Sequence, residues 1–174
     1  MHKNDLKNLN DYILEHAKMQ FVCFNLSKNC DDLGYPGFTH FFQVQAQDEF
    51  LHQRRIMNYI LDNGLDYKIE GANVEIKKFD NIVDILKEYI HHRTHFAKIT
   101  NQYTEEAKNN MDYTTVKFYE WFAIDFYEEI SETNDLIDWI NMSNQNHYDI
   151  DKKVLMRENP DTLAVVDPFA PHQD

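Results

Sequence analysis

Apolar residues recur every three or four positions along four long stretches of the chain, and this period is typical of amphipathic helices. The stretches cover residues 5–33, 36–63, 80–109 and 112–142. Gly34 ends the first stretch, Pro36 suits the first turn of the second helix, and Asp80 is the expected N-cap of the third. The pattern therefore predicts an all-α fold.

The connections between these helices differ in length. The first two helices and the last two are joined by a few residues each, so the members of each pair should be antiparallel neighbours. Residues 65–79 contain Gly71 and show no helical period. About 15 extended residues span up to about 50 Å, whereas a helix of about 28 residues is about 42 Å long, so this segment can cross the whole bundle. We expect an up-down-down-up four-helix bundle with one long crossover.

The C-terminal part of the chain is less regular. A short amphipathic piece over about residues 150–158 predicts a fifth helix. Most of the prolines follow it, and we expect the chain from Pro160 onward to be extended or disordered. The sequence thus divides into one domain over residues 1–159 and a C-terminal tail over residues 160–174, whose role the sequence does not reveal.

Composition fits a packed domain that attracts cations. The chain has 174 residues, 43% hydrophobic and 14% aromatic, and its 17 basic against 30 acidic residues give a net charge of −13. That charge opposes binding to nucleic acid and to anionic membranes. Cys23 and Cys30 lie two helical turns apart, too far to bridge, so we expect reduced thiols. Without a signal-peptide core or a membrane span, a soluble cytoplasmic protein is expected.

Polar residues interrupt the apolar face of every predicted helix at one level. Glu49 and His52 are one helical turn apart and can reach the same ion. At 1.5 Å per residue, all the interruptions lie about 14–18 residues from the nearest turn, so they converge on one layer. A buried layer of charges is costly unless its members pair or bind a cation, so the pattern predicts a central metal site. The interruptions are His16, Glu49, His52, Arg93, Asp125, Glu128 and Glu129.

Three segments carry more specific motifs. Residues 33–42 read LGYPGFTHFF, residues 45–52 read QAQDEFLH, and residues 118–122 read FYEWF. With these motifs the chain, to about residue 159, resembles the non-haem ferritins of bacteria and archaea. The resemblance implies a ferritin-like four-helix bundle that builds a hollow shell of twenty-four subunits, alone or with other ferritin subunits. It also implies that Fe(II) is oxidised at a di-iron site and stored as ferric mineral.

The resemblance assigns metal ligands and exposes two departures. Glu49, His52 and Glu129 stand where the family has its bridging glutamate, its histidine and a glutamate of the second iron. His16 replaces a glutamate. It either ligates a metal, in which case two imidazoles also suit Zn, or hydrogen-bonds a carboxylate in a metal-free layer. Arg93 replaces another glutamate, and we expect it to pair with Glu129 or Glu49 and to take the second metal's place.

Other positions near the site also bear on metal binding. Phe126 replaces a polar neighbour of the second iron, and Cys23, expected to be a small apolar core residue, replaces a tyrosine. A further set of acidic residues matches an additional inner iron position of bacterial members, although it also fits an ordinary acidic surface. This set is Asp48, Asp125 and Glu128, together with Glu129.

The expected function is intracellular iron storage in a hollow shell, with a di-iron ferroxidase site altered by His16 and Arg93 and therefore slow if active. One alternative is a non-catalytic structural shell subunit with a salt-bridged bundle centre. Another is a small ferritin-like DNA-protection protein. The charge of −13 and the absence of a helical period in residues 65–79 disfavour the last alternative.

Overall fold

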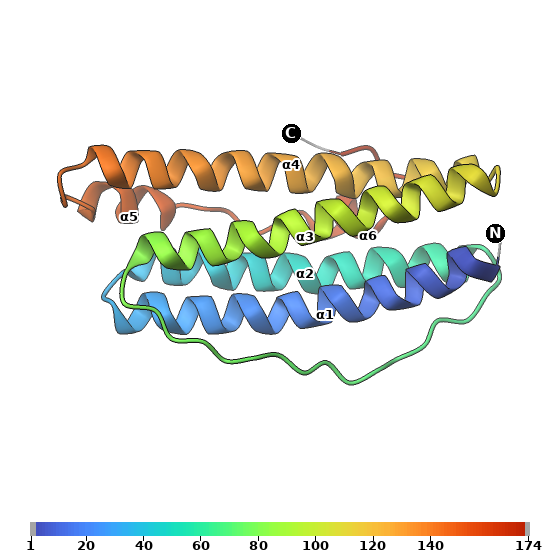
Figure 1. The fold of residues 1–174 in the computed structure, drawn as a ribbon, viewed down its shortest axis with the longest axis horizontal. Coiled ribbons are helices and arrows are strands. Elements are labelled where there is room, and N and C mark those ends of the chain that lie inside the picture. The colour runs from blue at the N-terminus through green and yellow to red at the C-terminus, as the bar shows by residue number, and fades with distance from the viewer. Residues whose placement is uncertain (1–2, 173–174) are drawn as a thin grey trace.

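The four amphipathic stretches form four long helices in the computed structural model, which describes residues 3–172 (Figure 1). No β-strand occurs between residues 3 and 172, so the predicted all-α fold is confirmed. The termini of the predicted domain and tail, residues 1–2 and 173–174, lie outside the described residues. The helices are α1 (Lys3–Asp32), α2 (Pro36–Asp62), α3 (Ile82–Asn109), α4 (Tyr113–Met142), α5 (Tyr148–Val154) and α6 (Thr162–Val166).

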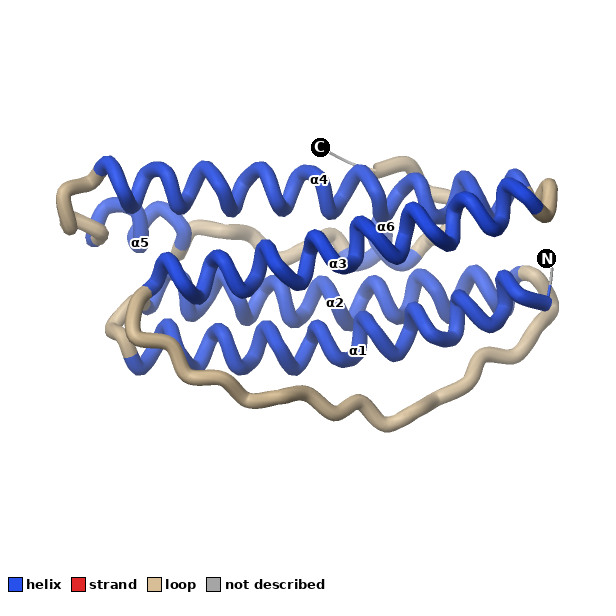
Figure 2. The backbone as a smooth tube through the Cα atoms, viewed as in Figure 1, coloured by secondary structure: helices blue, strands red, loops and turns tan. Residues whose placement is uncertain are grey.

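A long non-helical crossover connects the two antiparallel helix pairs (Figure 2). Short turns join α1 to α2 and α3 to α4, and Gly34, with a φ of 82°, supplies the left-handed conformation that ends α1. Residues 65–79 return along the bundle, so α3 runs parallel to α2. Asn25 of α1 holds the crossover by accepting the backbone N–H of Lys77 at 3.0 Å. The predicted up-down-down-up topology is confirmed.

Several predicted helix boundaries shift by a few residues. Asn81, not Asp80, caps α3, because its side-chain oxygen accepts the backbone N–H of Asp84 at 2.9 Å. The first helix covers residues 3–32 instead of 5–33, and the fifth covers 148–154 instead of 150–158. Helix ends are decided by local contacts such as this cap of α3, which the apolar period does not register.

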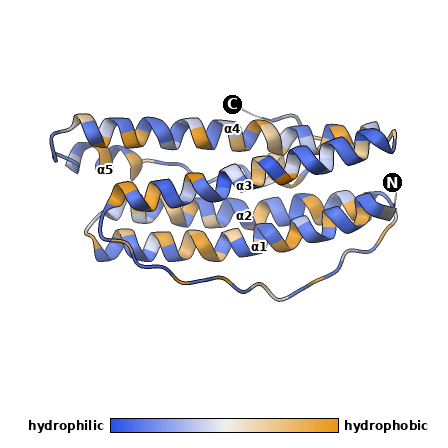
Figure 3. Cartoon of the chain, viewed as in Figure 1, coloured by the Kyte–Doolittle hydropathy of each residue, from blue (hydrophilic) through white to orange (hydrophobic). Residues whose placement is uncertain are grey.

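Apolar side chains fill the space between the four long helices, and hydropathy alternates along each of them (Figure 3). Tyr59 of α2 stacks on Phe118 of α4 with ring centroids 4.1 Å apart. Cys23 and Cys30 are buried free thiols, as their spacing predicts. None of the helices within residues 3–172 is both long and apolar enough to cross a membrane.

Helix α5 is anchored to the first turn of α2. The Asp151 carboxylate accepts the backbone N–H groups of Gly37 and Phe38 at 3.0 and 2.9 Å. First-turn N–H groups have no partner inside their own helix, and the helix dipole favours a carboxylate there. The approach is so close that a Cβ on Gly37 would lie 1.7 Å from the Asp151 carbonyl oxygen. Glycine is therefore required at this position.

The tail folds back onto the bundle, so the expectation of an extended or disordered segment from Pro160 is wrong. Helix α6 lies in this segment, against α2. The buried Arg55 of α2 donates to the carbonyl oxygens of Val165 and Ala170 at 3.0 Å each. These bonds join one side chain to backbone carbonyls more than a hundred residues away. Helical periodicity carries no information about such contacts.

Replacing Gly37 with alanine should loosen the contact between α5 and α2. The new methyl group forces the Asp151 backbone to move, and overpacking of this kind costs about 1–3 kcal/mol. Gly71→Ala is the matched control, because a Cβ there meets nothing within 4 Å. We expect a lower thermal midpoint for Gly37→Ala and an almost unchanged one for Gly71→Ala by circular dichroism. Equal midpoints for the two variants would contradict the proposed anchor.

Candidate metal centre

Polar positions of the four long helices meet in one buried layer at the bundle centre. His16 comes from α1, Glu49 and His52 from α2, Arg93 from α3 and Glu129 from α4. All five residues are more than nine-tenths buried. Equal distances from the turns place them at one height, because each helix rises 1.5 Å per residue. Direct contacts join four of them, as the predicted convergence requires, but Glu128, predicted to belong to the same layer, is exposed and lies outside it.

Arg93 contacts both carboxylates of this layer. Its Nη2 lies in a short contact with Glu49 Oε1, and its Nε lies 2.7 Å from Glu129 Oε2. Tyr89 and Gln45 donate hydrogen bonds to Glu129 Oε1 at 3.0 and 2.6 Å. Glu129 is thus surrounded by donors, and no group of potential metal ligands among the described residues includes it.

His16, Glu49 and His52 form a first group suited to a metal ion. Each offers one ligand atom, and these atoms lie within 4.8 Å of one another. His16 Nδ1 lies 2.6 Å from Glu49 Oε2, while Arg93 takes Glu49 Oε1. Both oxygens of Glu49 are therefore engaged. A metal ion that uses Glu49 must displace one of these contacts.

Burial and Arg93 together set the charges in this layer. Burial would raise the pKa of Glu49, but the Arg93 guanidinium and the His16 ring hold it at about 2. Burial raises the pKa of Glu129 above its usual range, even though Arg93, shared with Glu49, acts to lower it. Burial also lowers the pKa of His52 to about 4, so its imidazole is neutral at pH 7 and keeps a nitrogen lone pair for a metal.

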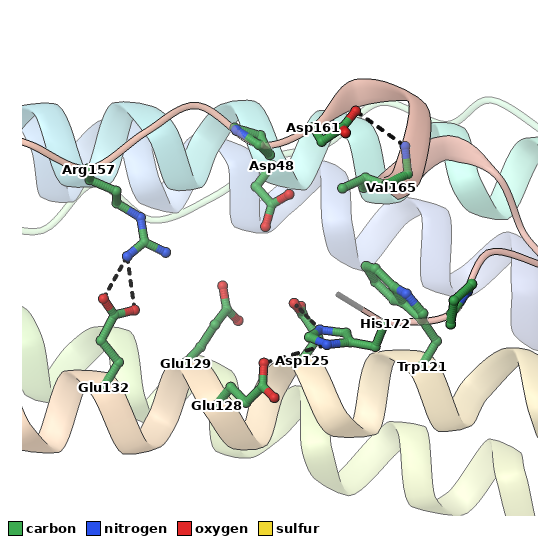
Figure 4. A pocket seen from close by; sticks show the side chains of 13 residues that line it. Asp48, Trp121, Asp125, Glu128, Glu129, Glu132, Arg157, Asp161, Val165 and His172 are labelled. Atoms are coloured by element: carbon green, nitrogen blue, oxygen red, sulfur yellow. Dashed lines mark hydrogen bonds and ion pairs between the residues drawn. The ribbon is translucent and has the colours of Figure 1, made fainter. Parts of the chain in front are cut away.

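A second group lies between α2 and α4, at the edge of a pocket (Figure 4). His52 Nε2 lies 3.4 Å from Asp48 Oδ2 and 3.5 Å from Asp125 Oδ2. Asp48, His52 and Asp125 also offer ligand atoms within 4.8 Å of one another. Glu128 is exposed and, among the described residues, belongs to neither group. His52 is thus shared by two candidate metal groups.

Apolar side chains close the layer on the remaining sides. Phe126 is fully buried, and its ring centroid lies 5.9 Å from the His16 ring and 5.4 Å from the guanidinium carbon of Arg93. It supplies no ligand. Cys23 is also buried, and burial raises the pKa of its thiol well above the usual range, so it packs as a small apolar residue.

Sequence reasoning misses two residues next to these groups. Arg55 follows His52 by three positions, so it lies on the inward stripe of α2, and this spacing is the signal that could have found it. Its guanidinium carbon lies 4.0 Å from the Trp121 ring centroid. His172 of the tail places its Nε2 3.2 Å from Asp125 Oδ1. No local pattern marks His172, because it lies outside any helix.

Comparisons with known proteins agree with this architecture. A family model described as a ferritin-like domain matches residues 6–143. The bacterial non-heme ferritin of Staphylococcus haemolyticus (strain JCSC1435) is 29% identical over 138 residues, which cover 79% of this chain and 80% of the relative. That of Staphylococcus aureus (strain USA300) is 31% identical over 134 residues, which cover 74% of this chain and 78% of the relative.

Solved ferritin structures share the fold at lower identity. An engineered closed form of the Archaeoglobus fulgidus ferritin superposes with a TM-score of 0.87 at 18% identity, covering 92% of this chain and 99% of that one. A humanized archaeal ferritin gives a TM-score of 0.88 at 16% identity with the same coverage. Since the family model spans most of its length and a relative is 31% identical over 74% of it, the chain belongs to the ferritin family.

Proposed function

We propose that the chain is the subunit of an iron-storing ferritin shell whose bundle centre holds at most one metal ion. Membership of the ferritin family supports assembly and iron storage. The observation that carries the rest is the position of Arg93, fully buried between Glu49 and Glu129. Iron is the cargo of this protein: it arrives as Fe(II) and is stored as Fe(III).

Arg93 changes what the centre can bind. A guanidinium stays protonated in proteins and has no lone pair to offer a metal. Its charge repels a cation about 4 Å away by about 4 kcal/mol per unit charge at an effective dielectric of about 20. For a divalent ion the repulsion is about 8 kcal/mol, which corresponds to about a millionfold loss of affinity. A second ion is excluded, while His16, Glu49 and His52 leave a place for one.

The loss of the second ion has a chemical consequence. Reduction of O₂ to hydrogen peroxide takes two electrons, and each Fe(II) supplies one when it becomes Fe(III). Two ions held side by side deliver both electrons together, and bridging carboxylates stabilise the charge that develops. A centre that holds one Fe(II) supplies only one electron, so the reduction of O₂ requires a second Fe(II) that is bound elsewhere. We therefore infer slow ferroxidase activity and storage that relies on other sites or on co-assembled subunits.

A non-catalytic structural subunit is the second candidate. Arg93 pairs with Glu49 and Glu129, and Tyr89 and Gln45 donate to Glu129 Oε1, so the two carboxylates have partners without a metal. A transition metal other than iron, such as Zn, also fits the two imidazoles of the first group. The crossover over residues 65–79 contains no helix, which disfavours a DNA-protection protein further.

The purified chain should assemble into a large hollow particle. Phe21 and Phe24 are adjacent on α1 and about half exposed, at 48% and 46%, which is the kind of apolar surface that subunit contacts bury. Size-exclusion chromatography and negative-stain microscopy at neutral pH and moderate salt should show closed shells. Salt matters because a chain of charge −13 repels its own copies. Elution only as monomer or dimer would refute assembly.

Removing the charge of Arg93 should accelerate iron oxidation. The native protein, mixed with about two Fe(II) per subunit and O₂, should lack a fast phase in stopped-flow absorbance. Arg93→Glu removes the guanidinium and adds an oxygen ligand, so a fast phase at least about tenfold quicker should appear. Arg93→Gln removes only the charge and should give an intermediate rate.

Arg54→Glu is the matched control for this experiment. It makes the same change of charge on the same level of the bundle, but at an exposed position of α2. Its kinetics should follow those of the native protein. A fast phase in the native protein that saturates near two irons per subunit would show that Arg93 does not exclude the second ion.

A further inference from the structure

The described part of the C-terminal tail, residues 160–172, closes one side of the groove between α2 and α4 (Figure 4). A pocket of about 410 Å³ remains under it. Asp48 of α2, Asp125 of α4 and His172 of the tail line this pocket. Trp121 lines it as well and is only 8% exposed. The tail therefore covers a pocket that would otherwise be an open groove.

This covered pocket is the polar approach to the bundle centre. His52, a member of the central group of potential ligands, is completely buried. Its Nε2 lies 3.4 Å from Asp48 Oδ2 and 3.5 Å from Asp125 Oδ2, and both of these carboxylates line the pocket. Carboxylate oxygens can replace the water ligands that a metal ion loses on its way to His52. One layer of side chains thus separates the pocket from the centre.

Aromatic side chains enclose the centre around His16. The ring centroids of Tyr12 and Phe96 lie 4.7 Å from that of His16, and those of Phe122 and Phe126 lie at 5.3 and 5.9 Å. An ion that passed between these rings would lose its water without gaining an oxygen ligand, which is very costly. The pocket under the tail is therefore the favoured path for a metal ion.

Side-chain hydrogen bonds from α2 hold the tail in this position. Arg55 donates to four tail carbonyl oxygens, those of residues 164, 165, 168 and 170, at 3.0–3.4 Å. Asn58 donates to the Val166 carbonyl oxygen at 2.9 Å. Helix α6 has no buried residue, and Leu163 is 81% exposed. The tail therefore depends on these bonds more than on apolar burial, and it can detach without unfolding of the four long helices.

We propose that the tail is a latch that controls the exchange of the metal ion at the bundle centre, and that Arg55 keeps this latch closed. While the tail is docked, the central ion is shielded from solvent and from chelators. When the bonds to Arg55 break, the pocket opens and the ion can leave or enter. Arg55 is a positioning residue, because it acts through the tail. The inference rests on the proposed function, since it requires an ion at the centre.

The first test measures the exchange of Co(II) in the full-length protein. Native protein and Arg55→Lys are loaded with Co(II) and mixed with excess EDTA, and the visible absorption of the bound ion gives the release rate. Lysine keeps the charge but lacks the forked donors that hold several carbonyl oxygens. Release and uptake should both be about tenfold faster or more, which is the effect of about one hydrogen bond to a charged group. The Kd should stay unchanged, because no candidate ligand is altered.

Two further variants serve as controls for this test. Arg54→Lys makes the same substitution one position earlier, at an exposed site of α2, and should exchange Co(II) like the native protein. Asn58→Ala removes one neutral hydrogen bond and should accelerate exchange less than Arg55→Lys. Circular dichroism verifies that each variant keeps its helices. Weaker binding in Arg55→Lys with an unchanged uptake rate would overturn the latch, because Arg55 would then shape the centre itself.

Hydrogen exchange tests the latch without any metal. The Val165 and Ala170 amides bond to carbonyl oxygens within the tail, so they report on its opening. In mass spectrometry the tail of Arg55→Lys should exchange about tenfold faster than that of the native protein, because exchange of a docked segment follows its opening equilibrium. Equal exchange in the two proteins would refute the latch. A native tail that exchanges as fast as a free peptide of the same sequence would refute it as well.

The two measurements separate this inference from the proposed function. A protein that binds no Co(II) at its centre contradicts the proposed function, whereas hydrogen exchange still decides whether Arg55 holds the tail closed. A protein that binds Co(II) and exchanges it equally fast in the native form and in Arg55→Lys keeps the proposed function and refutes the latch.

Discussion

The contact of Arg93 with Glu49 and Glu129 is the constraint on which the bundle centre depends. One guanidinium serves two buried carboxylates, and removing a partner from such a cluster costs several kcal/mol, because a charge is then left without compensation. Tyr89 and Gln45 add neutral donors around Glu129 and so reduce what Arg93 must supply. The chain thus supplies its own cation to the two carboxylates of this layer.

This arrangement separates stability from metal binding. In a layer of carboxylates alone, an ion would have to neutralise the charge, and the metal-free protein would be strained by repulsion. Here Arg93 compensates the charge of the carboxylates. His52 lies between this charged layer and the carboxylates of Asp48 and Asp125. Its Nδ1 faces the charged layer, at 3.9 Å from Glu49, and its Nε2 faces Asp48 and Asp125.

The sequence could predict the bundle because its determinants are periodic. The spacing of apolar residues fixes the helices, and the distance of His16 and Arg93 from their turns fixes the height of the polar layer. The cap of α3 could not be decided this way, since Asp80 and Asn81 are both good capping residues and only the geometry selects Asn81. An error of one residue at the end of a long helix does not change which face of that helix is buried, so the predicted bundle is unaffected.

The tail could not be predicted because its determinants are single contacts between distant residues. Its helix α6 has only 5 residues, too few to show a period, and its docking depends on carbonyl oxygens that any residue carries. Arg55 could be predicted only in part. Its position on the inward stripe of α2 follows from the helical period, but its partners are backbone carbonyl oxygens of residues 164–170, which no pattern indicates.

A buried arginine on the inward stripe of α2 needs hydrogen-bond acceptors. The helix neighbour that Arg55 contacts is the ring face of Trp121, which does not replace these acceptors. The hydrogen-bond acceptors for Arg55 must therefore come from another segment. The C-terminal tail supplies them and is held against α2 by these bonds. Arg55 points to the groove between α2 and α4. The hydrogen bond of Arg55 to Ala170 thus holds the backbone next to His172, whose Nε2 lies 3.2 Å from Asp125 Oδ1.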